Sequence, residues 1–187
     1  MVKETIDFAK TALVLIDLQK GIVGVPGGDR VVENAAKLVD LFHRRGGFIV
    51  FVNVDFHDGK DVLKPLTDQP FPAGERADDW AVLDPRLDIG NQDYRLTKRQ
   101  WGAFFGTDLD LQLRRRGIDT IVLGGISTNR GVEGTAREAF HYGYHQFFIG
   151  DAMTAHSEEE HRASIQFIFP YIGRVRSTDG FIKQADE

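Results

Sequence analysis

The 187-residue sequence contains no cysteine, and this absence excludes several kinds of chemistry at once. Without a thiol the chain has no disulfide, no thiolate metal ligand and no cysteine nucleophile. Long apolar runs are also missing, since none approaches the roughly 18 residues that a membrane-spanning helix needs. Residues 1–10 carry two lysines and two acids without an apolar core, which is unlike a signal peptide. We therefore expect a cytoplasmic protein that does not contact a membrane.

Positive charge is scarce as well. The 23 Lys and Arg residues are outnumbered by 28 Asp and Glu residues, which gives a formal net charge of −5. The longest run of Lys and Arg, Arg114–Arg116, ends a polar-faced helix, where positive charge complements the carbonyl end of the helix dipole. The sequence therefore lacks the basic surface that binding to nucleic acid requires.

What the sequence does contain is an alternation of strand-length apolar runs with amphipathic stretches. The apolar runs are bounded by Gly or Asp, as is typical of strands buried on both faces of a parallel sheet. They cover residues 12–16, 48–54, 120–126 and 146–149, and shorter strands are expected at 94–98 and 173–177. Helical patterns cover residues 29–45, 108–116, 128–142 and 157–170. The alternation predicts one α/β domain over residues 1–187, a three-layer doubly wound sandwich with a mainly parallel, Rossmann-like sheet of about six strands.

Residues 57–92 interrupt this alternation. The segment has weak periodicity and holds four of the six prolines. We expect an excursion over the sheet, because long ordered loops in compact domains usually serve as lids or binding loops.

Polar residues at the carboxyl ends of the predicted strands are candidates for function, because active sites of doubly wound sheets lie there. These residues are Asp17, Asp55, Lys98, Ser127 and Asp151. Burial would raise the pKa of Asp17 and suit it to general acid or base catalysis, although it could equally cap the next turn. Lys98 could stabilise a developing anion or pair with a carboxylate, although a surface lysine fits the pattern too.

A third candidate is the junction at residues 124–133, where a buried strand runs directly into a helix. Thr128 or Asn129 is a suitable N-cap, and the free N–H groups of the first turn can hold an oxyanion or a carboxylate. A capped connection without any ligand is the alternative. The junction contains neither the G-x-G-x-x-G pattern of dinucleotide-binding folds nor the G-x-S-x-G pattern of serine hydrolases.

Taken together, three ordered motifs resemble those of the isochorismatase-like hydrolases, from Thr11 to about Ile182. They are Asp17-Leu18-Gln19 after the first strand, Lys98 in mid-chain, and the stretch GISTNRGVEGTAREA from Gly125 to Ala139. The last stretch is similar to the family pattern G-[VI]-x-T-x-x-C-V-x-x-T-A-x-[DE]-A. The family's nucleophilic cysteine falls at Gly131, so covalent catalysis at this position is excluded.

The resemblance is to the subset of the family without the cysteine, which includes isochorismatases that cleave a vinyl ether. It implies that Asp17 is a general acid that protonates the enol-ether carbon of a small anionic substrate, so that water can capture the resulting cation. Lys98 would position Asp17 and offset charge, while the turn 127–131 would bind substrate oxygens. The alternative is a catalytically inactive protein that keeps the fold and binds small molecules or serves in an assembly.

The resemblance also implies contacts to substrate and a cis peptide bond before Ser127. The residues assigned to substrate binding are Gln19, Trp101, Phe105, Ile126, Ser127, Thr128 and Arg130. Arg130 would bind a substrate carboxylate or reach across a subunit interface, and both possibilities stay open. Trp101 and Phe105 would line the pocket, pack a loop onto the sheet or fill a subunit contact. Family members form dimers and tetramers, so we expect a homo-oligomer.

No cofactor or metal is expected. Asp55-Phe56-His57 matches part of the metal motif of nicotinamidases, a branch of the same family. However, no histidine occurs between His57 and His141 to complete the ligand set. The remaining histidines near the predicted helices, at positions 141, 145, 156 and 161, are predicted to be surface residues.

Overall fold

The structure is a computed structural model that describes residues 5–69 and 76–187. At its centre lies a six-stranded sheet in the order β3-β2-β1-β4-β5-β6, with every adjacent pair parallel. The strands are β1 (Thr11–Ile16), β2 (Phe48–Val54), β3 (Tyr94–Lys98), β4 (Thr120–Ile126), β5 (His145–Thr154) and β6 (Arg174–Arg176). The predicted α/β class with a parallel sheet is therefore confirmed.

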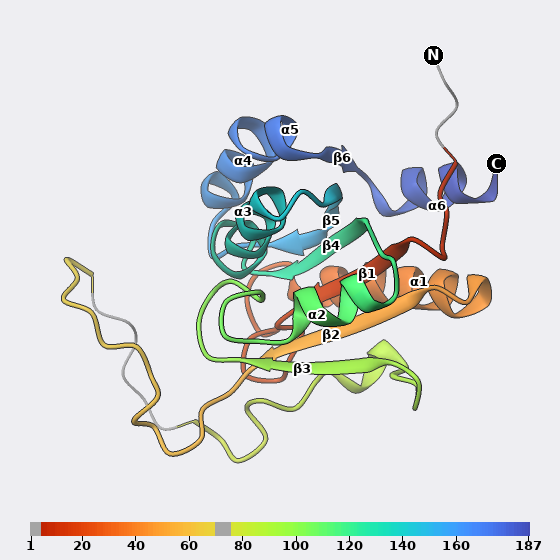
Figure 1. Ribbon diagram of the computed structural model, residues 1–187. Coiled ribbons are helices and arrows are strands. Elements are labelled where there is room, and N and C mark those ends of the chain that lie inside the picture. Colours follow the sequence, from red (N-terminus) through yellow and green to blue (C-terminus); the bar gives the residue numbers. More distant parts are fainter. Residues whose placement is uncertain (1–4, 70–75) are drawn as a thin grey trace.

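Helices cover both faces of the sheet (Figure 1). They are α1 (Gly28–Arg45), α2 (Leu109–Arg115), α3 (Glu133–His141), α4 (Glu158–Phe167), α5 (Phe169–Ile172) and α6 (Thr178–Asp186), with short turns η1 (Pro85–Leu87) and η2 (Thr128–Val132). The apolar cluster on one face includes residues of α1 and α6, and the cluster on the other includes residues of α2, α3 and α5.

The first strand shows why the sheet needs cover on both sides. Leu13 and Leu15 of β1 point into the cluster beneath α1, whereas Val14 and Ile16 point into the opposite cluster. All four side chains are buried. Burial of each stabilises the fold by about 1.5–3 kcal/mol, so a continuous apolar run favours a central strand with helices on both faces.

Three elements differ from the sequence prediction. The helix expected at 157–170 is two helices, α4 and α5, broken at Ile168, because Pro170 lacks an N–H group and restricts the residue before it. Helix α6 was not predicted. Strand β5 continues to Thr154 with a register shift against β4, so Asp151 lies inside the strand rather than at its end.

The excursion between β2 and β3 has two parts. Up to residue 69 the chain extends away from the sheet in Figure 1, and Leu66 is fully exposed, so the prediction that this part lies over the sheet is wrong. Residues 76–92 return to the body, where the backbone N–H of Lys20 donates to the carbonyl of Val82 and Gln19 forms a β-bridge with Leu83. Within the described ranges, every helix is too short or too polar to cross a membrane.

Candidate active site

The candidate site lies between the carboxyl ends of β1 and β4, the central neighbours in the sheet. The chain leaves β1 toward β2 and leaves β4 toward β5, on opposite sides, so this is the point where the strand order reverses. Ligands of open α/β sheets bind in the crevice at such a point. Asp17 follows β1 directly, and the turn η2 follows β4 after Ser127.

Asp17 and Lys98 form a buried ion pair at this end of the sheet. The Lys98 Nζ lies 2.7 Å from Asp17 Oδ2, and the two side chains are 1% and 7% exposed, respectively. Lys98 is the last residue of β3, so its long side chain crosses the end of β2 to reach Asp17. The same ammonium group donates to the carbonyl of Gln100 at 2.9 Å. Two acceptors therefore fix the charge of Lys98 beside the carboxylate.

The environment of Asp17 favours its protonated form. Burial raises the pKa of Asp17 to about 6, although the charge of Lys98 and its hydrogen bond act in the opposite direction. Within the described residues, the second carboxyl oxygen, Oδ1, is buried without a hydrogen-bond partner. Asp17 is therefore a carboxyl group with one oxygen held by an ammonium group and one oxygen available for proton transfer.

The backbone brings the ends of β1 and β4 unusually close. Asp17 has a φ of 54°, in the left-handed region that Asp tolerates better than most residues, and its N–H donates to the carbonyl of Val52. Gly125 has a φ of 128°, and a Cβ atom there would lie 2.1 Å from the carbonyl oxygen of Ile16. Only glycine permits this approach.

The turn after β4 contains the predicted cis peptide bond, between Ile126 and Ser127. Residues Thr128–Val132 form a single π-helical turn before α3 begins. The predicted capping by Thr128 or Asn129 is wrong. Ser127 holds the N-cap position without a side-chain cap, and the Thr128 hydroxyl bonds instead to His161 Nδ1 at 2.8 Å.

Gly131 directly faces the ion pair. A Cβ atom at this position would lie 3.1 Å from Asp17 Oδ2 and 2.9 Å from Ile16 Cγ2. The carbonyl of Gly131 accepts from Thr135 Oγ1 at 2.7 Å, and Thr135 Oγ1 in turn accepts from the N–H of Ala103. A side chain at 131 would thus touch the carboxyl group and press on Ile16, so glycine keeps this closely surrounded position free of any side chain.

Two residues assigned to substrate binding have other roles. Gln19 is fully buried, and its amide group donates to the carbonyls of Val54 and Trp80 while its oxygen accepts from the N–H of Val54. It links the returning excursion to β2, and its contact with substrate stays a prediction. The Ile126 side chain is buried in the apolar cluster beneath α1, which leaves only its backbone to face the site.

The rim residues lie closer to solvent. Arg130 points toward α4, with Nη2 4.0 Å from Glu160 Oε1. Trp101 and Phe105 are 51% and 73% exposed, whereas Phe104 between them is buried in the core. Ser127, by contrast, is buried. The aromatic pair is thus available to a ligand or to a second subunit, and the intervening Phe104 anchors the loop.

His161 and Asp151 were misjudged from the sequence. His161 is half-buried against Thr128 rather than a surface residue, and burial lowers its pKa. Asp151 accepts from the N–H and hydroxyl of Thr178, so it fixes the start of α6. Both contacts join residues about thirty positions apart, and no local pattern signals them.

The residues present do not fit a nicotinamidase-type metal site. Asp55 accepts from the N–H of Phe56, and the N–H of His57 donates to Asp61. Among residues 5–69 and 76–187, no three His, Asp or Glu side chains converge as ligands.

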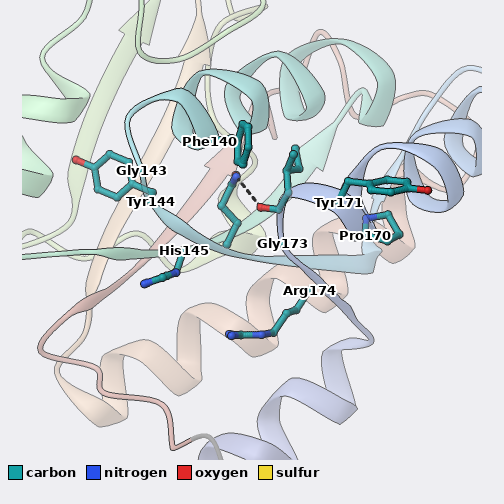
Figure 2. Close-up of a pocket in the computed structure, with 10 residues that line it drawn as sticks. Phe140, Gly143, Tyr144, His145, Pro170, Tyr171, Gly173 and Arg174 are labelled. Atoms are coloured by element: carbon teal, nitrogen blue, oxygen red, sulfur yellow. Dashed lines mark hydrogen bonds between the residues drawn. The ribbon is translucent and has the colours of Figure 1, made fainter.

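A separate groove of about 420 Å³ lies at the opposite, amino-terminal end of β5. Figure 2 shows the rings of Phe140 and Tyr171 at this groove, between the end of α3 and α5. Neither Asp17 nor Lys98 lines it. The groove is therefore distinct from the candidate active site.

Comparison with known proteins agrees with this geometry. Residues 11–180 match the model of the isochorismatase domain. The chain is 63% identical to the uncharacterized isochorismatase family protein YwoC of Bacillus subtilis, over 96% of each chain, and 48% identical to YecD of Escherichia coli, over 90% of this chain and 93% of YecD. An isochorismatase family protein from Burkholderia thailandensis superposes with a TM-score of 0.93 at 40% identity, covering 98% of both chains. Matches of this extent in sequence and fold show that the chain belongs to the isochorismatase family.

Proposed function

We propose that this protein is a cysteine-independent hydrolase that cleaves a small anionic enol ether, with isochorismate as the nearest template. The observation that carries the proposal is the Asp17 carboxyl group, whose pKa is raised to about 6 and whose Oδ1 is unpartnered within the described residues. It faces Gly131, where no side chain separates it from a substrate.

In the proposed reaction, protonated Asp17 would transfer its proton to the terminal carbon of the enol ether. The C=C bond supplies the electron pair, and an oxocarbenium ion forms at the ether carbon. Water adds to this cation and loses a proton, and the hemiketal collapses to pyruvate and the alcohol. One water molecule is consumed, and a proton from solvent restores Asp17.

Lys98 would supply the positive charge that this step needs, and the turn would supply hydrogen-bond donors. Proton transfer leaves a carboxylate at Asp17, and the Lys98 ammonium 2.7 Å away stabilises that charge. The first N–H groups of a helical turn have no intrahelical acceptors, so those at the start of the turn 127–131 would hold the substrate carboxylate. The N–H of Arg130 is not among them, because it donates to the carbonyl of Ser127. The protein would thus act through preorganised donors and one proton, without a covalent intermediate.

The test is pyruvate release from isochorismate, followed with lactate dehydrogenase and NADH. Because general acids contribute about 10²–10⁴-fold, Asp17→Asn should lower kcat/KM by at least about 100-fold. Asp55→Asn is the matched control, since Asp55 also follows a strand but is exposed, and it should keep wild-type turnover. Full turnover by Asp17→Asn would eliminate the proposed mechanism.

The second candidate is a small-molecule binder without catalysis. The observation that favours it is the lack of any cysteine, with glycine at the position where other family members carry the nucleophile. In that case isochorismate or aromatic carboxylates would raise the Tm without being consumed. Turnover of any compound that raises the Tm would exclude this candidate.

A further inference from the structure

Helix α4 is attached to the substrate-binding turn mainly through polar contacts. Its only buried residue is Ser164, whose hydroxyl donates to Glu133 Oε2 at 2.6 Å. Three residues earlier, His161 Nδ1 lies 2.8 Å from Thr128 Oγ1. Glu160 approaches Arg130 at 4.0 Å. The side of α4 that faces the site therefore contacts residues 128–133 through polar side chains.

The His161–Thr128 bond is the contact that reaches the start of the turn. Thr128 is fully buried, so its hydroxyl needs a protein partner. Its carbonyl also accepts the N–H of Glu133, the first residue of α3. A shift of Thr128 would therefore move the turn that brings Gly131 against Asp17.

The chemistry of His161 suits a fixed contact. Burial lowers the pKa of His161, with Arg30 of α1 acting in the same direction and Glu158 opposing it. The imidazole is therefore neutral near pH 7. A neutral ring at this distance forms one hydrogen bond with the hydroxyl in either tautomer.

We propose that His161 is a positioning residue, which holds Thr128 and with it the turn 127–131 in register with Asp17. The effect on catalysis rests on the proposed function. The effect on the turn itself exists in the ligand-free protein and can be measured there.

The first experiment therefore needs no substrate. Amide hydrogen exchange of residues 129–133 is compared among wild type, His161→Asn and His161→Gln. Asn places a polar atom where Nδ1 stands, whereas Gln carries its amide one bond further out. Exchange should be about tenfold faster in His161→Gln and close to wild type in His161→Asn. His156→Gln is the matched control, because His156 is exposed just before α4.

The second experiment uses turnover of isochorismate. His161→Gln should lower kcat/KM about tenfold, mainly through KM, because the turn binds substrate oxygens. His161→Asn should stay within about twofold of wild type. A general loss of stability would lower kcat/KM in both variants to the same extent. It would not change KM while leaving kcat unaltered.

Two results would overturn the assignment of His161: an unchanged rate of amide exchange in His161→Gln, or an equal decrease in kcat/KM in the Asn and Gln variants. If His161→Gln does not fold, Thr128→Val and Thr128→Ser examine the same bond from its other end, and only the Val variant should accelerate exchange. Absence of turnover by the wild type would refute the proposed function alone, because the exchange result would still decide the role of His161.

Discussion

Helices α1 and α4 are held to the rest of the molecule in opposite ways. Nine of the 18 residues of α1 are buried, and they include Val32, Leu38 and Phe42 of the core beneath the sheet. Of the ten residues of α4 only Ser164 is buried. Arg30 of α1 nevertheless contributes to the lowered pKa of His161 in α4, after burial as the main cause.

The difference separates stability from positioning. Apolar burial along α1 contributes to the free energy of folding but tolerates small shifts, since it has no preferred direction. The hydrogen bonds of α4 contribute little net stability but fix particular atoms of the turn. We infer that α1 holds the fold together and that α4 holds the site in shape.

The largest expected change in stability comes from a direct comparison of core and surface substitutions in the two helices. Leu38→Ala in α1 should lower the free energy of unfolding by about 2–5 kcal/mol, because it leaves a cavity in the core. Phe167→Ala in α4 removes a larger side chain that is 68% exposed, and should change stability by less than about 0.5 kcal/mol. Urea denaturation measures both. Similar losses in the two variants would abolish the distinction between the helices.

A second prediction concerns Gly131, at the junction of the rigid sheet and the turn. Gly131→Cys should cost about 1–3 kcal/mol, because the new Cβ lies 2.9 Å from Ile16 Cγ2 and something must shift. The chain has no other cysteine, so iodoacetamide would label this position alone. Mass spectrometry should find one adduct. Labelling only after denaturation would contradict the access to Asp17 that the proposed function requires.

The same division explains what could be predicted from the sequence. The apolar periods of β1 and α1 predicted their positions to within a residue, because burial imposes a local repeat. Side-chain contacts between distant segments leave no such repeat, so the bonds of Gln19 to Trp80 and of His161 to Thr128 could not be predicted. Asp17 was identifiable because a polar residue directly after a buried run marks a strand end.

A third prediction uses pH to separate Asp17 from His161. As general acid, Asp17 must be protonated, so kcat/KM should be level below about pH 6 and fall about tenfold for each pH unit above it. Burial lowers the pKa of His161, so the imidazole loses its proton at a lower pH than a free histidine and is neutral at the alkaline end of this limb. Isochorismate turnover between pH 5 and about 8 gives the profile. A rate that rises with pH would instead identify Asp17 as a base.

The smallest expected change in stability concerns Arg130, at the edge of the contact between α4 and the turn. Its ion pair with Glu160 spans 4.0 Å and is partly exposed, so Arg130→Gln should alter the free energy of unfolding by less than about 0.5 kcal/mol. Its effect on KM then separates the two roles that the sequence left open. A rise of about tenfold or more would mean that the guanidinium binds the substrate carboxylate, and Glu160→Gln, which removes only the ion pair, should not reproduce it. An unchanged KM would assign Arg130 to the attachment of α4 or to a subunit contact. Light scattering separates these two roles, because only a subunit contact would make Arg130→Gln self-associate less than the wild type.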